Sequence, residues 1–190
     1  MNAKPLHVER ALHERVEIVP YDPAWPALFA EEAARLRAQL PAELIGRIEH
    51  FGSTAVPGLA AKPIIDMLVE VSSMEDVVQR IAPILERAGY EFFWRDRERG
   101  LPGVEYAWFI RRDAAGRRTH HIHCLEKGSL EWERLLFRDY LRTHPEAAAQ
   151  YGALKRRVAA EYPDDRVAYA RAKTDFIADA MQAMRRAQSG

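Results

Sequence analysis

The segment Pro63–Val71, with the sequence PIIDMLVEV, limits the fold more than any other part of this 190-residue chain. Its nearly continuous apolar character is typical of a strand that is covered on both faces in the middle of a sheet. Side chains alternate along a strand, so Asp66, Leu68 and Glu70 share one face. A buried carboxylate without a partner is costly. Asp66 is therefore expected to meet a metal ion, several hydrogen-bond donors, or a lysine or arginine in a purely structural pair.

A glycine turn lies before this strand, where another predicted strand ends in the sequence HFGST, residues 50–54. Gly52 would let the backbone approach a ligand closely. Exposed amides beside the Ser53 and Thr54 hydroxyls suit a phosphate group. Lys62, at the far end of the loop, is placed to offset phosphate charge. Taken alone, the same turn is also typical of a serine or threonine that caps a helix.

The second group of polar residues is the sequence THHIHC, residues 119–124. In a strand, His121 and His123 project from one face, and two imidazoles at this spacing can bind a metal ion or hold an anion. A complete metal site needs a further ligand, and Asp66 is the candidate if the two strands are neighbours. The alternative is a surface histidine cluster beside Arg117 and Arg118.

Further polar residues could contribute to the same site. Glu70 shares the strand face of Asp66, and the others lie in the glycine turn or on predicted C-terminal helices: His50, Arg138, Lys155, Tyr169 and Lys173. The alternative for those on helices is that they belong to solvated helix faces.

Hydrophobic periodicity and turn residues predict a single α+β domain at 14–190, after a flexible arm at 1–13. A mixed sheet of five or six strands carries one early helix, one crossover helix and a C-terminal helical layer. The expected strands are Val16–Val19, Arg47–Phe51, Pro63–Val71, Tyr90–Trp94, Val104–Arg111 and Arg117–Leu125. The expected helices begin at Asp22, Met74, Leu130, Thr143 and Asp164 or Asp165, and Pro83 should kink or split the second of them.

Composition excludes several classes of protein. No apolar run approaches the roughly 20 residues of a membrane span, and the first residues lack the apolar core of a signal peptide. Cys124 is the one cysteine, which excludes an internal disulfide and a cysteine-rich zinc site. The net charge of +0 gives no basic excess for nucleic acid. We therefore expect a soluble cytoplasmic protein that does not act at a membrane and does not bind nucleic acid. The expected ligand, a small phosphate-bearing molecule, follows from the Gly52 turn and Lys62.

The glycine turn and Asp66 resemble the signature of the nucleotidyltransferase superfamily of the DNA-polymerase-beta type. That signature is an apolar residue, Gly-Ser, a gap of about a dozen residues, then Asp-x-Asp/Glu; here twelve residues separate Ser53 from Asp66. The resemblance implies that carboxylates hold Mg²⁺ and that the turn grips a nucleoside triphosphate. The chain departs from the pattern at Leu68, where the second acid is expected. Histidine in place of an acid would favour a softer ion, such as Mn²⁺ or Zn²⁺.

A closer resemblance, over about residues 14–180, is to the GrpB family within that superfamily. It is carried by HFGSTAVPGLAAKPIIDMLV, THHIHCLEKGS, FRDYLRTHPEAAAQYGALK and the late Tyr169-x-x-x-Lys173. The resemblance implies a nucleotidyltransferase-like fold that binds a nucleotide or other phosphate ester. Asp66 would be the catalytic and metal-binding acid. Because such domains occur fused to dephospho-CoA kinase, the alternative is a non-catalytic helper module for a protein partner; a metal-dependent phosphate-ester hydrolase is a third hypothesis.

Overall fold

The computed structural model describes residues 10–11, 14–95 and 106–188. Five strands form one mixed sheet: β1 (Ile45–Phe51), β2 (Ile65–Val71), β3 (Glu91–Arg95), β4 (Tyr106–Arg112) and β5 (Arg118–Glu126). Their order is β1-β2-β5-β4-β3, with β2 parallel to β5 and the other neighbours antiparallel. The predicted α+β class is confirmed. The strand that carries Asp66 is an interior strand, second in the order, although the middle strand is β5. The predicted arm at 1–13 lies almost wholly outside the described residues.

The pairing of β2 with β5 decides which side chains meet. Asp66 pairs with His121 and Leu68 with His123, while Phe51 of β1 pairs with Asp66 from the other side. Side chains of paired residues project from the same face of the sheet. The register therefore places Asp66 and two histidines side by side on one face.

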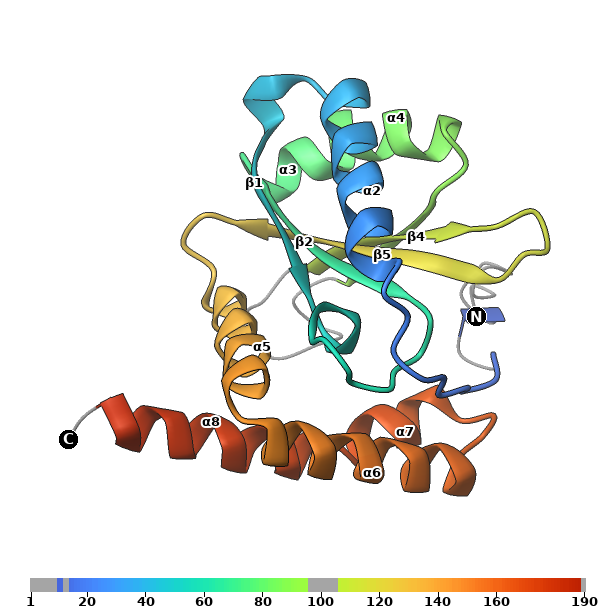
Figure 1. Ribbon diagram of the computed structural model, residues 1–190. Helices are drawn as coiled ribbons and strands as arrows, with labels where there is room; N and C mark the ends of the chain where they lie inside the picture. The colour runs from blue at the N-terminus through green and yellow to red at the C-terminus, as the bar shows by residue number, and fades with distance from the viewer. Residues whose placement is uncertain (1–9, 12–13, 96–105, 189–190) are drawn as a thin grey trace, which may run out of the picture.

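The opposite face carries the main hydrophobic core. It is covered by α2 (Trp25–Gln39) and by the crossover segment α3 (Met74–Asp76), η3 (Val77–Ile81) and α4 (Ala82–Arg87), which lie together above the sheet (Figure 1). Met67 and Val69 of β2 point into this core against Leu36, Val77 and Ile81, among others.

Two features of the crossover segment follow from its sequence. Ser73 caps it by accepting a hydrogen bond from the Asp76 amide, and Gly89 ends it with a φ of 88°. Proline lacks the N–H that continues a helix ladder. The segment contains one π-helical turn at Val77–Ile81, immediately before α4, which contains Pro83. The predicted disruption is therefore confirmed, as a change from α-helical to π-helical hydrogen bonding.

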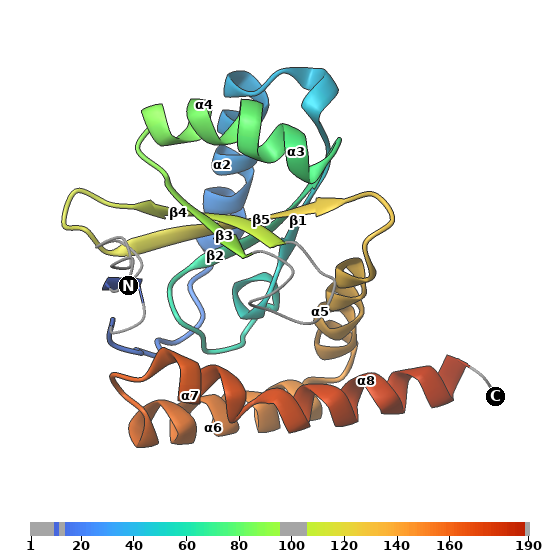
Figure 2. The ribbon, with the colours of Figure 1, turned by 180° about the vertical axis from the view of Figure 1, so that it is seen from behind.

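A C-terminal layer of helices lies on the other side of the sheet (Figures 1 and 2). It consists of η4 (Leu130–Glu133), α5 (Arg134–Thr143), α6 (Pro145–Glu161), α7 (Arg166–Arg171) and α8 (Thr174–Gln188). Separate small clusters of buried residues join it to the loop before β2, with Val56 and Leu59 packed against Leu141 and Tyr151. The space between this layer and the sheet contains the cavity described below.

One predicted strand and one predicted helix start are wrong. The segment at Val16–Val19 is not a strand of the sheet: the Val16 amide donates to the Pro163 carbonyl, and Val19 makes only an isolated bridge to Ala61. Its hydrogen bonds go to the helical layer and a loop. The first helix begins at Trp25, because the Asp22 carboxylate accepts from the Ala24 amide and closes a turn ahead of the helix.

The C-terminal helices also differ from the prediction in two places. Thr143 does not open a helix; its hydroxyl donates to the Asp139 and Tyr140 carbonyls and so belongs to the end of α5. The predicted last helix is divided into α7 and α8, with Asp165 capping α7 through two amides. This break places Lys173 in the short connection, where its side chain reaches the cavity.

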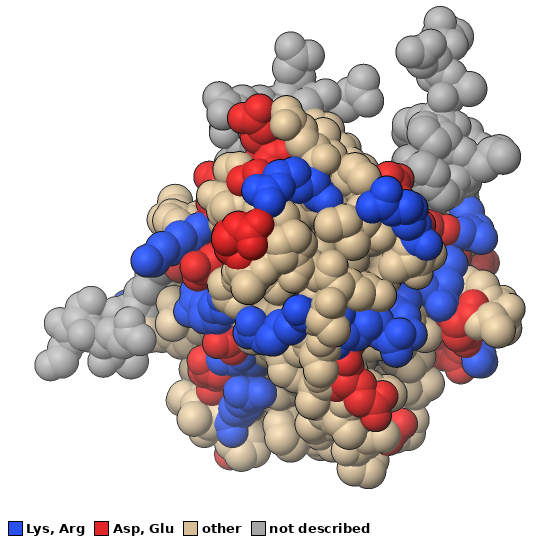
Figure 3. Space-filling view, turned by 90° about the horizontal axis from the view of Figure 1, so that it is seen from above, with Lys and Arg blue, Asp and Glu red and all other residues tan. Residues whose placement is uncertain are grey.

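The face formed by α2 and the crossover segment carries positive and negative side chains interspersed (Figure 3). None of the helices within 10–11, 14–95 and 106–188 combines the length and the apolar character that a membrane crossing requires.

Candidate metal and phosphate site

Asp66, His121 and His123 converge at the junction of β2 and β5. One ligand atom from each residue lies within 4.8 Å of the others. The Asp66 Oδ1 is 3.1 Å from the His121 Nδ1 and 3.9 Å from the His123 Nε2. Metal–ligand bonds are near 2 Å, so a small inward adjustment of these side chains would place all three around one ion. The sequence predicted this group, on the condition that the strands were neighbours.

Burial and hydrogen bonding set the protonation states of this cluster. Burial raises the pKa of Asp66, but hydrogen bonds to His121 and His123 outweigh that effect and hold the pKa well below its ordinary value. Burial lowers the pKa of His121 to about 4, against the opposing pull of Asp66, and it lowers the pKa of His123 for the same reason. At neutral pH the cluster is thus one carboxylate and two neutral imidazoles, the forms that bind metal ions.

A second layer of residues orients the two imidazoles. The Tyr106 hydroxyl lies 2.5 Å from the His123 Nδ1 and accepts a 2.8 Å hydrogen bond from Arg134. Burial raises the pKa of Tyr106 to about 12, so its hydroxyl keeps its proton. This contact occupies Nδ1 and leaves Nε2 directed at Asp66, as outer-layer partners of metal-binding histidines commonly do. On the other side, Arg118 Nη1 lies 3.4 Å from the His121 Nε2.

The turn at Gly52 fits closely around Asp66. Gly52 has φ 72° and ψ −169°, a conformation that is essentially restricted to glycine. A Cβ added at this position would lie 2.6 Å from the Asp66 Oδ2. The glycine therefore allows the backbone to pass directly beside the Asp66 carboxylate. The predicted close approach of this backbone to a ligand stays a prediction.

The residues around Gly52 differ in what their side chains contact. Ser53 and Thr54 both border the cavity, but Thr54 is buried and its hydroxyl bonds to His50 and to the Ile64 carbonyl. His50 stacks on Phe29 with ring centroids 4.8 Å apart, on the core face of the sheet. The structure places His50 away from the Asp66 cluster, as a support for the turn.

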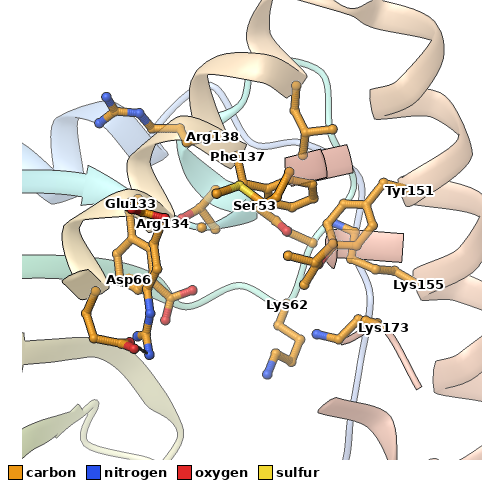
Figure 4. A pocket seen from close by; sticks show the side chains of 18 of the residues that line it. Ser53, Lys62, Asp66, Glu133, Arg134, Phe137, Arg138, Tyr151, Lys155 and Lys173 are labelled. Carbon is orange, nitrogen blue, oxygen red and sulfur yellow. Dashed lines mark ion pairs between the residues drawn. The ribbon is translucent and has the colours of Figure 1, made fainter. Parts of the chain in front are cut away.

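A cavity of about 570 Å³ opens between the sheet and the C-terminal helices, a size typical of ligand pockets. Asp66 and the Gly52–Thr54 turn form one side (Figure 4). Lys155 and Lys173 lie on the side of the C-terminal helices, and Lys62, from the loop before β2, lies between Asp66 and Lys173 (Figure 4). The remaining wall combines apolar and charged side chains of the C-terminal helices. The apolar ones include Leu130, Phe137, Leu141, Tyr151, Ile177 and Met181, and the charged ones are Glu131, Glu133, Arg134 and Arg138.

The three lysines form a cationic cluster with no carboxylate at ion-pair distance among the described residues. The Lys62 and Lys173 ammonium groups lie 5.3 and 4.1 Å from the centroid of the Tyr169 ring, and Lys155 donates to the Ala60 carbonyl at 2.5 Å. Burial, reinforced by the neighbouring lysines, lowers the pKa of Lys62 and of Lys155 to about 7. Burial lowers the pKa of Lys173 to about 8. Such a cluster is costly unless an anion joins it.

Two of the predicted residues face other partners. Arg138 borders the cavity, but its guanidinium turns toward β1, where it binds Glu49 and the His50 carbonyl. Glu70 lies against Gly46, further along β2, and does not join the metal cluster. No local sequence pattern predicts the positions of Tyr106 and Arg134, because one contacts His123 of the neighbouring strand and the other reaches Tyr106 from helix α5.

Comparison with known proteins identifies the fold and its relatives. The model of the family described as GrpB protein matches residues 15–183. The chain belongs to the GrpB family. The crystal structure of GrpB from Enterococcus faecalis is 39% identical, covers 88% of this chain and 99% of its own, and superposes with a TM-score of 0.71. The predicted family and fold are thereby confirmed.

Related sequences have the same core in longer proteins. A UPF0157 protein of Pseudomonas aeruginosa is 43% identical over 87% of this GrpB chain, which spans 66% of that protein. A dephospho-CoA kinase of Mycolicibacterium paratuberculosis is 32% identical over 87% of the chain, which spans 45% of the kinase. The chain thus spans about half to two thirds of the length of these relatives.

Proposed function

We propose that this GrpB protein binds a nucleotide or another phosphate ester together with a divalent metal ion, in the cavity between Asp66 and the three lysines. The observation that carries the proposal is the pairing of a three-ligand cluster with an unneutralised cationic cluster across one cavity. Asp66 links the two clusters, because it is one of the three candidate metal ligands and also lines the cavity that the lysines border.

The residues present fit a metal ion with nitrogen and oxygen ligands. Leu68, which occupies the place of the second acid, is fully buried, and its register partner on β5 is His123. The histidine therefore supplies, from the neighbouring strand, the ligand that β2 lacks. Two imidazoles and one carboxylate favour Mn²⁺ or Zn²⁺ over Mg²⁺, and three protein ligands leave positions for a ligand oxygen. When bound, the metal would polarise a phosphoryl oxygen.

The chain's own residues would hold the ester in place. The lysine cluster offsets phosphate charge, the Gly52 turn allows close approach of the backbone, and the apolar wall around Phe137 takes the uncharged part of the ligand. Tyr106 and Arg134 keep His123 oriented. If the site is catalytic, the reaction class is nucleotidyl transfer, in which these residues position the phosphate chain and an acceptor.

Calorimetry with Mn²⁺ or Zn²⁺, followed by a nucleoside triphosphate, tests the proposal. Asp66→Asn should abolish metal binding and weaken triphosphate binding. Asp179→Asn, which changes an exposed aspartate of α8, is the matched control and should bind as wild type. Absence of binding of both ligands in the wild type, or binding unaffected by Asp66→Asn, would refute the proposal.

The alternative is a non-catalytic helper module for a CoA-pathway kinase. It is supported by the relationship to a dephospho-CoA kinase in which a region of this kind makes up 45% of the protein. Co-purification with a dephospho-CoA kinase from the same organism would test it. A stable complex that survives Asp66→Asn favours the helper role, and lack of a complex opposes it.

A further inference from the structure

A second cluster of cationic side chains lies beside His121, where the sheet, the helical layer and the N-terminal segment meet. Glu14 is bound there by three arginines: Arg112 at 2.5 Å, Arg118, and Arg166 at 3.6 Å. They come from β4, β5 and α7, and the segment that contains Glu14 runs between the β4–β5 hairpin and α7 (Figure 1). We call Arg112, Arg118 and Arg166 the arginine cluster.

The arginine cluster carries more positive charge than its partners neutralise. Arg112 also binds Glu91, which in turn pairs with Arg10. Two carboxylates thus serve four arginines among the described residues. The Arg112 and Arg118 side chains are only 9% and 7% exposed, and the Nη2 of Arg112 is buried without a hydrogen-bond partner in the described part of the chain. Unneutralised charge at buried positions is costly, so an additional anion would be stabilised here.

Space for such an anion exists beside Glu14. A second cavity of about 340 Å³ is lined by Glu14, Arg118 and Arg166, and Lys62 forms part of its wall. Lys62 also lines the larger cavity. The cationic surface therefore continues from Lys173 past Lys62 to Arg118 and Arg166 of the arginine cluster. Arg118 is at the same time the neighbour of His121.

We propose that the arginine cluster is a second anion subsite, in which Glu14 is a resident carboxylate that gives way to an anionic group of the ligand. The inference rests on the proposed function, because the first anionic group of the same ligand lies at the metal and the lysines. The ligand class is a small molecule with several linked anionic groups, such as a polyphosphate ester, rather than a simple phosphate monoester. Guanidinium groups bind phosphate oxygens in pairs with charge-assisted hydrogen bonds.

Calorimetry with inorganic tripolyphosphate in the presence of Mn²⁺ tests the subsite. Glu14→Gln removes the competing charge and should raise tripolyphosphate affinity about tenfold, as expected for one charged contact. A gain of affinity cannot result from misfolding. Arg166→Ala should weaken tripolyphosphate binding by about the same factor. Arg171→Ala, on the exposed side of the same helix, should bind as wild type.

Orthophosphate separates the two proposals. It is too small to need the second subsite, so its affinity should fall in Lys173→Ala and stay unchanged in Arg166→Ala. If orthophosphate behaves in this way but Glu14→Gln leaves tripolyphosphate affinity unchanged or reduced, the subsite is refuted and the proposed function stands. If neither orthophosphate nor tripolyphosphate binds to the wild type with Mn²⁺ present, both proposals are refuted.

Discussion

Replacing Gly52 by alanine tests the geometry of the site most directly. The conformation of Gly52 costs a non-glycine residue about 1–3 kcal/mol. The new Cβ would also lie 2.6 Å from the Asp66 Oδ2 and 3.1 Å from the Asp66 Cβ, so the carboxylate must move and weaken its hydrogen bond with His121. Loss of that bond adds about 1 kcal/mol. We expect Gly52→Ala to lower the free energy of unfolding by about 2–4 kcal/mol in total.

Gly58→Ala is the matched control. Gly58 also has a positive φ, 76°, but a Cβ there meets nothing within 4 Å, so only the backbone cost of about 1–2 kcal/mol applies. Urea unfolding measures both free energies, and calorimetry measures Mn²⁺ or Zn²⁺ binding. Metal affinity should drop sharply in Gly52→Ala and stay at the wild-type value in Gly58→Ala. Equal destabilisation of the two variants, or undiminished metal binding by Gly52→Ala, would show that the turn does not constrain Asp66.

Three further predictions concern the lysines and Tyr106. Sulfate affinity should fall as the pH rises above 7, because Lys62 and Lys155, with pKa near 7, lose their charge. Calorimetry at pH 8 in two buffers should detect proton uptake when sulfate binds, and absence of that uptake would contradict the prediction. Lys173→Met should raise the free energy of unfolding at pH 7 by about 1–2 kcal/mol and weaken sulfate binding. Burial lowers the pKa of Lys173 from 10.5 to about 8, so folding of the wild type no longer buries a charged lysine at high pH. The stability gain of the variant should therefore shrink between pH 8 and 10.5. Tyr106→Phe should lower metal affinity about 10–100-fold and sulfate affinity by less. Equal losses of metal and sulfate affinity would argue against a role of Tyr106 in orienting His123.

The sequence predicted the convergence of Asp66, His121 and His123 well because the relevant pattern is local. A carboxylate in an apolar strand and two histidines at alternate positions each identify a strand face before any tertiary contact is known. The strand order could not be predicted from the sequence. The pairing of Asp66 with His121 depends on it, because the chain forms β3 and β4 before it returns as β5 to the side of β2.

The other half of the cavity was harder to predict because it depends on how helices pack. Lys155, Tyr169 and Lys173 read equally well as solvated positions, and only the break between α7 and α8 brings Lys173 to the cavity wall. Tyr106 sits in an apolar strand, where a tyrosine is ordinarily a packing residue. The error at Val16–Val19 has a related cause, because a short alternating segment does not reveal whether its partner is a sheet or a helix.

The parallel pairing of β2 with β5 also bears on the kinetics of folding. Asp66 and His121 are separated by 55 positions in the chain, and a parallel pair cannot close through a simple hairpin. Contacts of such long range form slowly, because the intervening chain must be ordered first. A metal ion that needs both residues would bind the folded chain and not its early intermediates, and it would stabilise the folded state by mass action. We therefore expect added metal to slow unfolding while leaving the early steps of refolding unchanged.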